Sequence, residues 1–269
     1  MNLTPLHLRK QILHMAHKGQ AVHVPCSFSI VEILSLLYSK HLKFNPNDPN
    51  DPTRDYFVLS KGHGVMALYA CMREIGWLTQ HDLDNYFKDG TLLHGLSEHK
   101  VPGCEVTSGS LGHGLPIAVG IALGLKKRGN TSQKVFCIVG DGELQEGPMW
   151  EALMFAGHHK LSNLTVIVDA NRFQAMGETS QILDIDPLVD KFKSFGLEAT
   201  ECDGHDIELL DSKITSLKKA SVASGKPQAL VARTEKGKGI SFMEGDNMWH
   251  YTRVSDETLA KSLKEWEGQ

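Results

Sequence analysis

The stretch from residue 134 to 173 constrains the fold more than any other part of this 269-residue chain. An apolar, β-branched run at 134–139 stops at the glycine loop 140–142, as a buried parallel strand does at its carboxyl end. Apolar residues at helical spacing follow at 148–159, and a second β-branched run occupies 164–169. Strand, loop, helix and strand of these lengths predict a right-handed βαβ unit whose two strands are parallel and close together.

Two polar side chains stand at the carboxyl ends of these strands. Asp141 ends the first strand and Asn171 follows the second, so both are expected to face the crevice in which open parallel sheets bind ligands. Their oxygens suit Mg²⁺ or Ca²⁺, and backbone carbonyls, water and the phosphates of a cofactor would complete the coordination. Gly140 and Gly142 would let the backbone come close to such a diphosphate. On its own, however, a strand-end Asp is more often a helix cap than a metal ligand.

Longer motifs carry a resemblance to a known family. The GDG loop with an Asn 30 positions after its Asp is similar to the thiamine-diphosphate motif, and GDGELQEG with HHKLSNL resembles transketolase. The Lys-Gly-His-Gly turn at 61–64 and the Thr-Ser-Gly-Ser-Leu-Gly-His-Gly segment at 107–114 resemble further transketolase motifs. The resemblance implies an α/β thiamine-diphosphate-binding fold, with a mostly parallel central sheet and helices on both faces, in a single domain over residues 1–269.

The resemblance also implies a cofactor site for thiamine diphosphate with Mg²⁺ or Ca²⁺. In the family, the His of the first turn lies against the diphosphate and the reaction centre, a role that falls to His63. The backbone of the second segment holds the thiazolium and diphosphate. The residue two beyond the Asn gives a carbonyl to the metal, so the implied metal ligands are Asp141, Asn171 and Phe173. The implied cofactor-binding residues are His63, Ser110, Leu111, Gly112, Gly140, Asp141, Gly142, Glu143 and Asn171.

The catalytic residues that the resemblance implies are His23, His63, His250 and Glu146. His23 lies in a loop that aligns with the Ser-Gly-His-Pro-Gly segment of transketolases, although the glycines are absent here. Glu146 and Glu151 correspond to acids that hydrogen-bond between paired active sites in the family. Both would also serve as ordinary partners of a helix dipole, so that alternative stays open.

Three further histidines have no settled role. Transketolases place a substrate-contacting His in the region of residues 80–103, where His94, His99 or neither takes this position. His113 replaces the usual Gln of Leu-Gly-Gln-Gly, and we expect it to tune the choice of donor sugar.

Composition argues against several other classes of function. A formal net charge of -4 without a basic block speaks against nucleic acid as a partner. The five cysteines are scattered without a CxxC, which favours a reducing compartment over a disulfide framework or a zinc site. The amino terminus has no continuous apolar signal region, and glycines and a proline interrupt the longest uncharged stretch, 106–125. We therefore expect a cytoplasmic protein without a membrane span.

The expected activity needs a second polypeptide. Transketolases activate thiamine diphosphate with a Glu from a further domain, which protonates the pyrimidine ring, and this sequence ends at Gln269 before any such domain. The chain is expected to be the N-terminal subunit of a split transketolase, or else a truncated form. In the split enzyme it would join a C-terminal subunit in an α₂β₂ heterotetramer. The complex would transfer a two-carbon ketol unit from a ketose or ketose phosphate to an aldose or aldose phosphate, as in pentose phosphate metabolism.

Other enzyme classes remain as alternatives. Deoxyxylulose phosphate synthase and the first component of 2-oxo acid dehydrogenases share parts of the motif set. A dinucleotide-dependent dehydrogenase fits less well, because GxGxxG is absent at the first turn.

Local signals predict the remaining elements. Thr4 and Pro5 indicate a helix to about His17, and the capping box of Ser29 and Glu32 predicts a helix to about His41. Strands are expected at 56–60, 197–202 and 228–234, and helices at 115–127, from Asp206 to about Ala220, and after Ser255.

Overall fold

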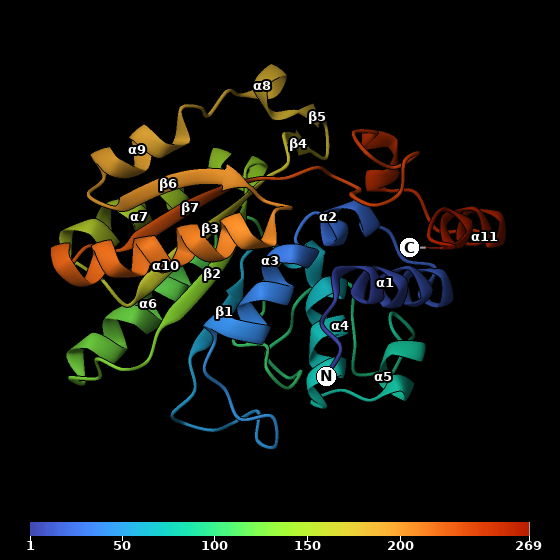
Figure 1. Cartoon of the computed structure of the whole chain (residues 1–269), viewed down its shortest axis with the longest axis horizontal. Helices are drawn as coiled ribbons and strands as arrows, with labels where there is room; N and C mark the ends of the chain where they lie inside the picture. Colours follow the sequence, from blue (N-terminus) through green and yellow to red (C-terminus); the bar gives the residue numbers. More distant parts are fainter. Residues whose placement is uncertain (269) are drawn as a thin grey trace.

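The computed structural model describes residues 1–268, and a five-stranded parallel sheet forms its centre (Figure 1). The strands run in the order β1-β2-β3-β7-β6, and every neighbouring pair is parallel. They are β1 Tyr56–Leu59, β2 Val135–Gly140, β3 Leu164–Ala170, β6 Glu198–Asp203 and β7 Gln228–Arg233. A separate antiparallel pair is formed by β4 Phe173–Gln174 and β5 Gly177–Glu178.

The predicted βαβ unit is confirmed. Every residue of β2 and β3 is buried, which explains why both strands are continuous apolar runs in the sequence. The helix between them is α7, Gly147–His158, and the strands pair directly, with Gly140 opposite Asp169. The loops that follow the two strands therefore meet at the same edge of the sheet.

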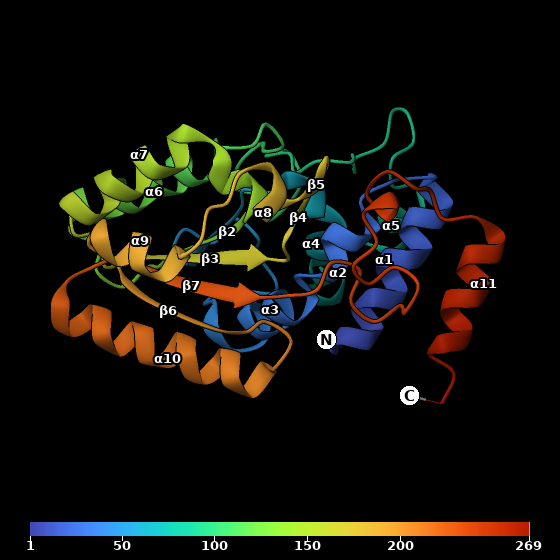
Figure 2. The same ribbon diagram turned by 90° about the horizontal axis from the view of Figure 1, so that it is seen from above.

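Helices cover both faces of the sheet (Figure 2). α6 Gly114–Lys127, α7 and α9 Leu188–Ser194 pack on one face, while α3 Val31–Leu36 and α10 Ile207–Ser224 pack on the other. Neighbouring residues of a strand point to opposite faces, so Cys137 joins the core under α6 and α7, while Phe136 joins the core under α10. The predicted α/β architecture is thus confirmed.

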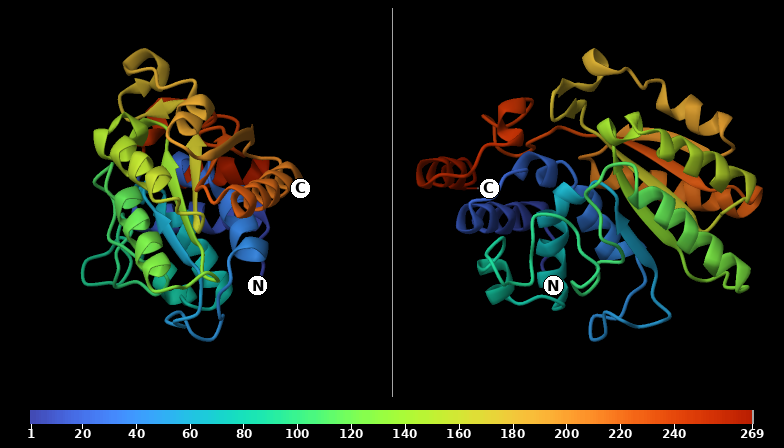
Figure 3. Two further views of the ribbon diagram at one scale, coloured as in Figure 1. Left: turned by 90° about the vertical axis from the view of Figure 1, so that its left-hand side faces the viewer. Right: turned by 180° about the vertical axis from the view of Figure 1, so that it is seen from behind.

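A second group of helices lies beyond the carboxyl ends of the strands (Figures 1 and 3). It consists of α1 Pro5–Gly19, α2 Val24–Phe28, α4 Val65–Ile75, α5 Gln80–Asp84 and α11 Asp256–Glu265, and a short α8 spans Thr179–Ile182 nearer β5. The loops that follow β1, β2 and β3 run between the sheet and this group. Side chains from both can therefore share one pocket.

The predicted capping box at Ser29 is wrong. The Ser29 hydroxyl hydrogen bonds to Asp169, with 2.8 Å between Oγ and Oδ2, and Glu32 accepts two hydrogen bonds from the Arg9 guanidinium. The chain forms α2, turns at Ser29 and Ile30, and continues as α3 and a π-helical turn to His41. The two side chains that the local pattern assigned to a helix cap instead form hydrogen bonds with residues that are distant in sequence.

The other predicted elements are confirmed, with small shifts at their ends. Asp206 and Ser255 cap α10 and α11 as expected, because their side chains accept hydrogen bonds from Leu209 and Thr258. In the described part of the chain, no helix combines the length and apolar character that crossing a membrane requires.

Candidate functional site

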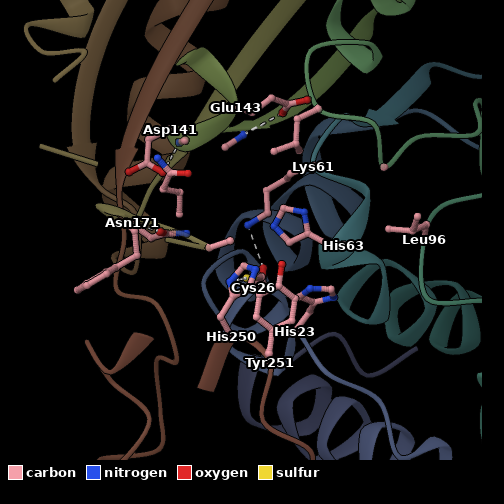
Figure 4. Close-up of a pocket in the computed structure, with 17 residues that line it drawn as sticks. His23, Cys26, Lys61, His63, Leu96, Asp141, Glu143, Asn171, His250 and Tyr251 are labelled. Atoms are coloured by element: carbon pink, nitrogen blue, oxygen red, sulfur yellow. Dashed lines mark hydrogen bonds between the residues drawn. The ribbon is translucent and has the colours of Figure 1, made fainter. Parts of the chain in front are cut away.

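A pocket opens where the loops after β1, β2 and β3 face α2 and the segment before α11 (Figure 4). Segments that are far apart in the sequence therefore share one cavity. The pocket is lined by His23, Cys26, Lys61, His63, Leu96, Gly109, Leu111, Gly140, Asp141, Gly142, Glu143, Asn171, Phe173, Gln174, Ala175, His250 and Tyr251.

Asp141 and Asn171 lie together at the carboxyl edge of the sheet, as predicted. Asp141 accepts hydrogen bonds from backbone N–H groups, of which that of Arg172 is 2.5 Å from Oδ2. The Asn171 amide is held at both ends: Oδ1 accepts from the Phe173 N–H at 3.1 Å, and Nδ2 donates to Asp169 at 2.9 Å. These contacts fix the orientation of both side chains towards the pocket.

Asp141 is a buried carboxylate that forms no ion pair within residues 1–268. Burial, and next the charge of Asp169, raises the pKa of Asp141 to about 7. Asp169 differs, because the ammonium of Lys61 pairs with it and outweighs the effect of burial, so that its pKa is lowered. A divalent cation beside Asp141 would supply the positive charge that this carboxylate lacks. The residues present thus fit a metal ion.

Glu143 ties three loops together and is only 2% exposed. Its Oε1 accepts hydrogen bonds from the Ser60 hydroxyl at 2.6 Å and from the Gly112 N–H at 3.1 Å. Its Oε2 accepts from the Gly140 N–H at 3.2 Å. One carboxylate therefore positions the turn after β1, the segment before α6 and the loop after β2.

Glycines bring the backbones of these loops into close contact. A Cβ on Gly62 would lie 2.5 Å from the Ser108 carbonyl oxygen, and a Cβ on Gly114 would lie 2.5 Å from the Cα of Ser60. No side chain would fit at either position. Beside His250, Lys236 is buried without a carboxylate partner among residues 1–268, whereas Lys61 is paired with Asp169. Such a lysine fits an anionic group such as a diphosphate.

Three imidazole rings form the opposite wall (Figure 4). The ring centroids of His23 and His63 are 5.4 Å apart, those of His23 and His250 are 4.9 Å apart, and those of His63 and His250 are 5.9 Å apart. The backbone N–H of His23 also donates to the carbonyl of His250 at 3.1 Å. The structure thus brings together the three histidines that the sequence singled out.

All three imidazoles are held in the neutral form near pH 7. Burial and the charge of Lys236 lower the pKa of His23 to about 4 and that of His250 to about 3. Burial and the charge of Lys61 lower the pKa of His63 well below its ordinary value. Each ring therefore has one donor nitrogen and one acceptor nitrogen.

Three of the predicted site residues do not line the pocket. Ser110 and Glu146 are exposed, and Gly112 is buried with its N–H already bonded to Glu143. His113 is exposed as well, and its Nδ1 is 3.2 Å from the Leu111 carbonyl oxygen. Leu111 is the member of the 110–112 segment whose side chain reaches the pocket.

The two histidines whose roles the sequence left open, His94 and His99, also lie outside the pocket. His94 lines a neighbouring cavity that shares His23 and Leu96 with it, and its Nδ1 bonds to Glu98. The Nδ1 of His99 lies 3.1 Å from the hydroxyl oxygen of Thr107. Leu96 lines the pocket in the region where the sequence left the choice between these histidines open.

Sequence reasoning missed several contributors to the site, and four of them concern the imidazoles most directly or replace a predicted contact. Cys26 and Leu96 line the pocket, and the lysines 61 and 236 are each 1% exposed close to the imidazoles. Lys61 directly precedes the Gly-His-Gly turn, which was a usable signal. No local sequence pattern identifies Cys26, Leu96 or Lys236 as a site residue. A lysine alone is usually interpreted as a surface residue, and a cysteine or a leucine as a core residue.

Comparison with known proteins first gives the class of the fold. Residues 7–268 match the family described as "Transketolase, thiamine diphosphate binding domain". A transketolase from Campylobacter jejuni superposes with a TM-score of 0.91 at 32% identity, over 97% of this chain and 42% of that one. A mutant transketolase from Pichia stipitis gives a TM-score of 0.90 at 27% identity, over 99% of this chain and 41% of that one. This chain thus spans about two fifths of those transketolases.

The chain belongs to the transketolase family, as the sequence motifs predicted. Two curated relatives match it over nearly their whole length. One of the subunits of the apulose-4-phosphate transketolase of Actinobacillus succinogenes is 40% identical over 96% of this chain and 92% of that protein. The 6-deoxy-6-sulfo-D-fructose transketolase subunit SqwG of a Clostridium species is 38% identical over 97% of this chain and 94% of that protein.

Proposed function

We propose that this chain is the diphosphate-binding subunit of a two-chain, thiamine-diphosphate-dependent transketolase. The observation that carries the proposal is the pocket itself, in which Asp141 and Asn171 face three neutral imidazoles across one cavity. The relatives of similar length are named as subunits, which supports a partner chain.

The proposed metal ligands are Asp141, Asn171 and the carbonyl of Phe173, with Mg²⁺ or Ca²⁺ as the ion. Within residues 1–268, no three His, Cys, Asp or Glu side chains are grouped so as to hold a metal. One carboxylate with two neutral oxygens is too small a set for either ion, so the diphosphate would complete it. The remaining proposed cofactor contacts come from His63, the 110–112 segment and the 140–143 loop.

When bound, thiamine diphosphate supplies the nucleophilic carbon that takes up the two-carbon unit. The protein's part at this point is to present neutral imidazoles to the hydroxyl and carbonyl oxygens of the sugar. His23, His63 and His250 can each donate one hydrogen bond and accept another, which suits proton movement between oxygens near pH 7. Burial, together with the charges of Lys236 and Lys61, keeps the three imidazoles neutral.

The donor sugar is proposed to be a ketose with an anionic end. The two relatives are named for apulose 4-phosphate and 6-deoxy-6-sulfo-D-fructose, a phosphate and a sulfonate. The acceptor would be an aldose. We further propose an α₂β₂ assembly in which Glu146, exposed at the start of α7, lies at the contact between paired active sites.

Calorimetry on the assembled complex tests the cofactor site. Asp141→Asn removes the one formal charge among the proposed ligands, so thiamine diphosphate should bind about 10-fold or more weakly in the presence of Mg²⁺. Asp190→Asn, on the exposed surface of α9, is the matched control and should leave binding unchanged. Binding that survives both Asp141→Asn and a chelator would refute the site.

A further inference from the structure

Lys236 is a buried lysine that donates to a catalytic-site imidazole. It follows β7, is 1% exposed, and forms no ion pair within residues 1–268. Its Nζ lies 2.9 Å from the Nδ1 of His250 and 2.7 Å from the Oδ1 of Asn247. Burial lowers the pKa of Lys236. In its ammonium form the group has three hydrogens and no lone pair, so that both contacts are then donations from the lysine.

A second donor points at the same nitrogen. The Sγ of Cys26 lies 3.5 Å from the Nδ1 of His250. Burial raises the pKa of Cys26, so the group is a thiol and its hydrogen is available. The thiol and the lysine thus converge on Nδ1, and towards an ammonium this nitrogen can only accept.

The other ring nitrogen follows from this constraint. A neutral imidazole has one N–H, and with Nδ1 accepting, the hydrogen of His250 resides on Nε2. No residue among 1–268 hydrogen bonds to this nitrogen, and the ring lines the pocket beside His23 and Tyr251. The Nε2–H group of His250 is therefore a hydrogen-bond donor that a ligand can use.

The surrounding backbone holds the ring in place. Residues Asn247–His250 form a 3-10 turn capped by Asp246, whose side chain accepts from the Met248 N–H. The Nδ2 of Asn247 donates to the Ala175 carbonyl at 3.1 Å, which keeps its Oδ1 directed at Lys236. The lysine and its imidazole are thus oriented by separate contacts.

We propose that Lys236 is a positioning residue that fixes His250 in the Nε2–H tautomer, so that His250 donates a hydrogen bond to a sugar oxygen and does not act as a base. The donation to sugar rests on the proposed function, whereas the tautomer is a property of the chain itself. The three imidazoles therefore differ. His250 presents a fixed hydrogen-bond donor, whereas no described residue fixes the tautomers of His23 and His63.

Nitrogen-15 NMR of the histidine-labelled complex reads the tautomer without any turnover. The His250 resonances, assigned by their loss in His250→Gln, should show a protonated Nε2 and an unprotonated Nδ1 near pH 7. Lys236→Met should shift the ring towards a mixture of both tautomers, whereas Lys238→Met, at a lysine paired with Glu244 outside the pocket, should not. A wild-type ring protonated at Nδ1 would overturn the proposal, because Lys236 would then be a neutral amine that accepts.

Paired substitutions of His250 test the donor role. The amide nitrogen of Gln can stand near the position of Nε2, whereas that of Asn reaches only towards Nδ1. His250→Gln should therefore retain more turnover than His250→Asn.

Lys236→Met should lower turnover about 10-fold to 100-fold in the wild-type background, the scale of one hydrogen bond to a charged group, and much less in His250→Gln. Equal losses from Lys236→Met in both backgrounds would contradict a role through His250.

Discussion

His63 lies in the turn after β1, with its ring facing His23 and His250. If it handles protons of the reacting sugar, His63→Ala should lower turnover by about two orders of magnitude, the usual scale for a positioned acid or base. His99→Ala, at an exposed histidine bonded to Thr107, is the control and should retain activity. Steady-state kinetics of the assembled enzyme measures the turnover of both variants. Equal turnover would contradict a role of His63 in proton transfer and leave it a structural role in the turn.

His23 should also make the protein sensitive to acid. Its pKa falls from 6.5 to about 4 on folding, through burial and the charges of Lys236 and Lys61. Between these values the unfolded state binds more protons than the folded state, so stability falls as pH drops from 6.5 towards 4. His23→Gln should flatten this part of the profile. Urea unfolding at pH 7 and pH 4.5 measures the difference, and an unchanged pH dependence would contradict the inferred pKa.

Sequence reasoning placed residues at the pocket where short local motifs mark them. Asp141, Asn171 and His63 sit in short motifs at strand ends, and they were found from those motifs. Cys26 and Lys236 come from opposite ends of the chain, and they come close to the imidazoles only because Cys26 contacts Lys61 and Lys236 contacts His250. No local sequence pattern indicates a contact between residues so far apart, so the positive charge of Lys236 beside the imidazoles could not be predicted.

At the scale of elements, the close approach of α6 to the turn after β1 should be costly to disturb. A Cβ on Gly114 would lie 2.5 Å from the Cα of Ser60, so Gly114→Ala should destabilise the chain by about 1–3 kcal/mol. Gly120, on the same helix, has no atom within 4 Å of its Cβ position. Gly120→Ala should stabilise by about 0.5–1 kcal/mol, because the helix interior loses a glycine. Denaturant unfolding compares them, and equal effects would contradict the packing.

The elements themselves were largely predictable for a physical reason. Strands β2 and β3 are buried on both faces, so their sequences are apolar throughout and need no context to be recognised. The capping box expected at Ser29 and Glu32 is absent because the Ser29 hydroxyl bonds to Asp169, 140 positions away, and because Glu32 pairs with Arg9. Capping patterns are local, and such distant partners override them.

At the scale of the whole molecule, the outer surface of α6 and α7 is a proposed assembly surface. Ile117, Met154 and Phe155 are 40%, 57% and 42% exposed on these two helices, which pack side by side (Figure 3). Met154→Glu should weaken assembly, because it buries a charge in an apolar contact. Val222→Glu, at an exposed valine on α10, is the control. Analytical ultracentrifugation reads the mass, and full assembly of Met154→Glu would exclude this surface.

The central claim is that these residues form one half of an active site. Ketol transfer from a ketose to an aldose should be measured, with thiamine diphosphate and Mg²⁺, for the purified chain, for a partner chain obtained by co-purification, and for their mixture. The account predicts activity in the mixture alone, because under the proposed function the partner would supply the carboxylate that protonates the pyrimidine. Substantial transfer by this chain without a partner would contradict it, since that carboxylate would then have to lie within these 269 residues.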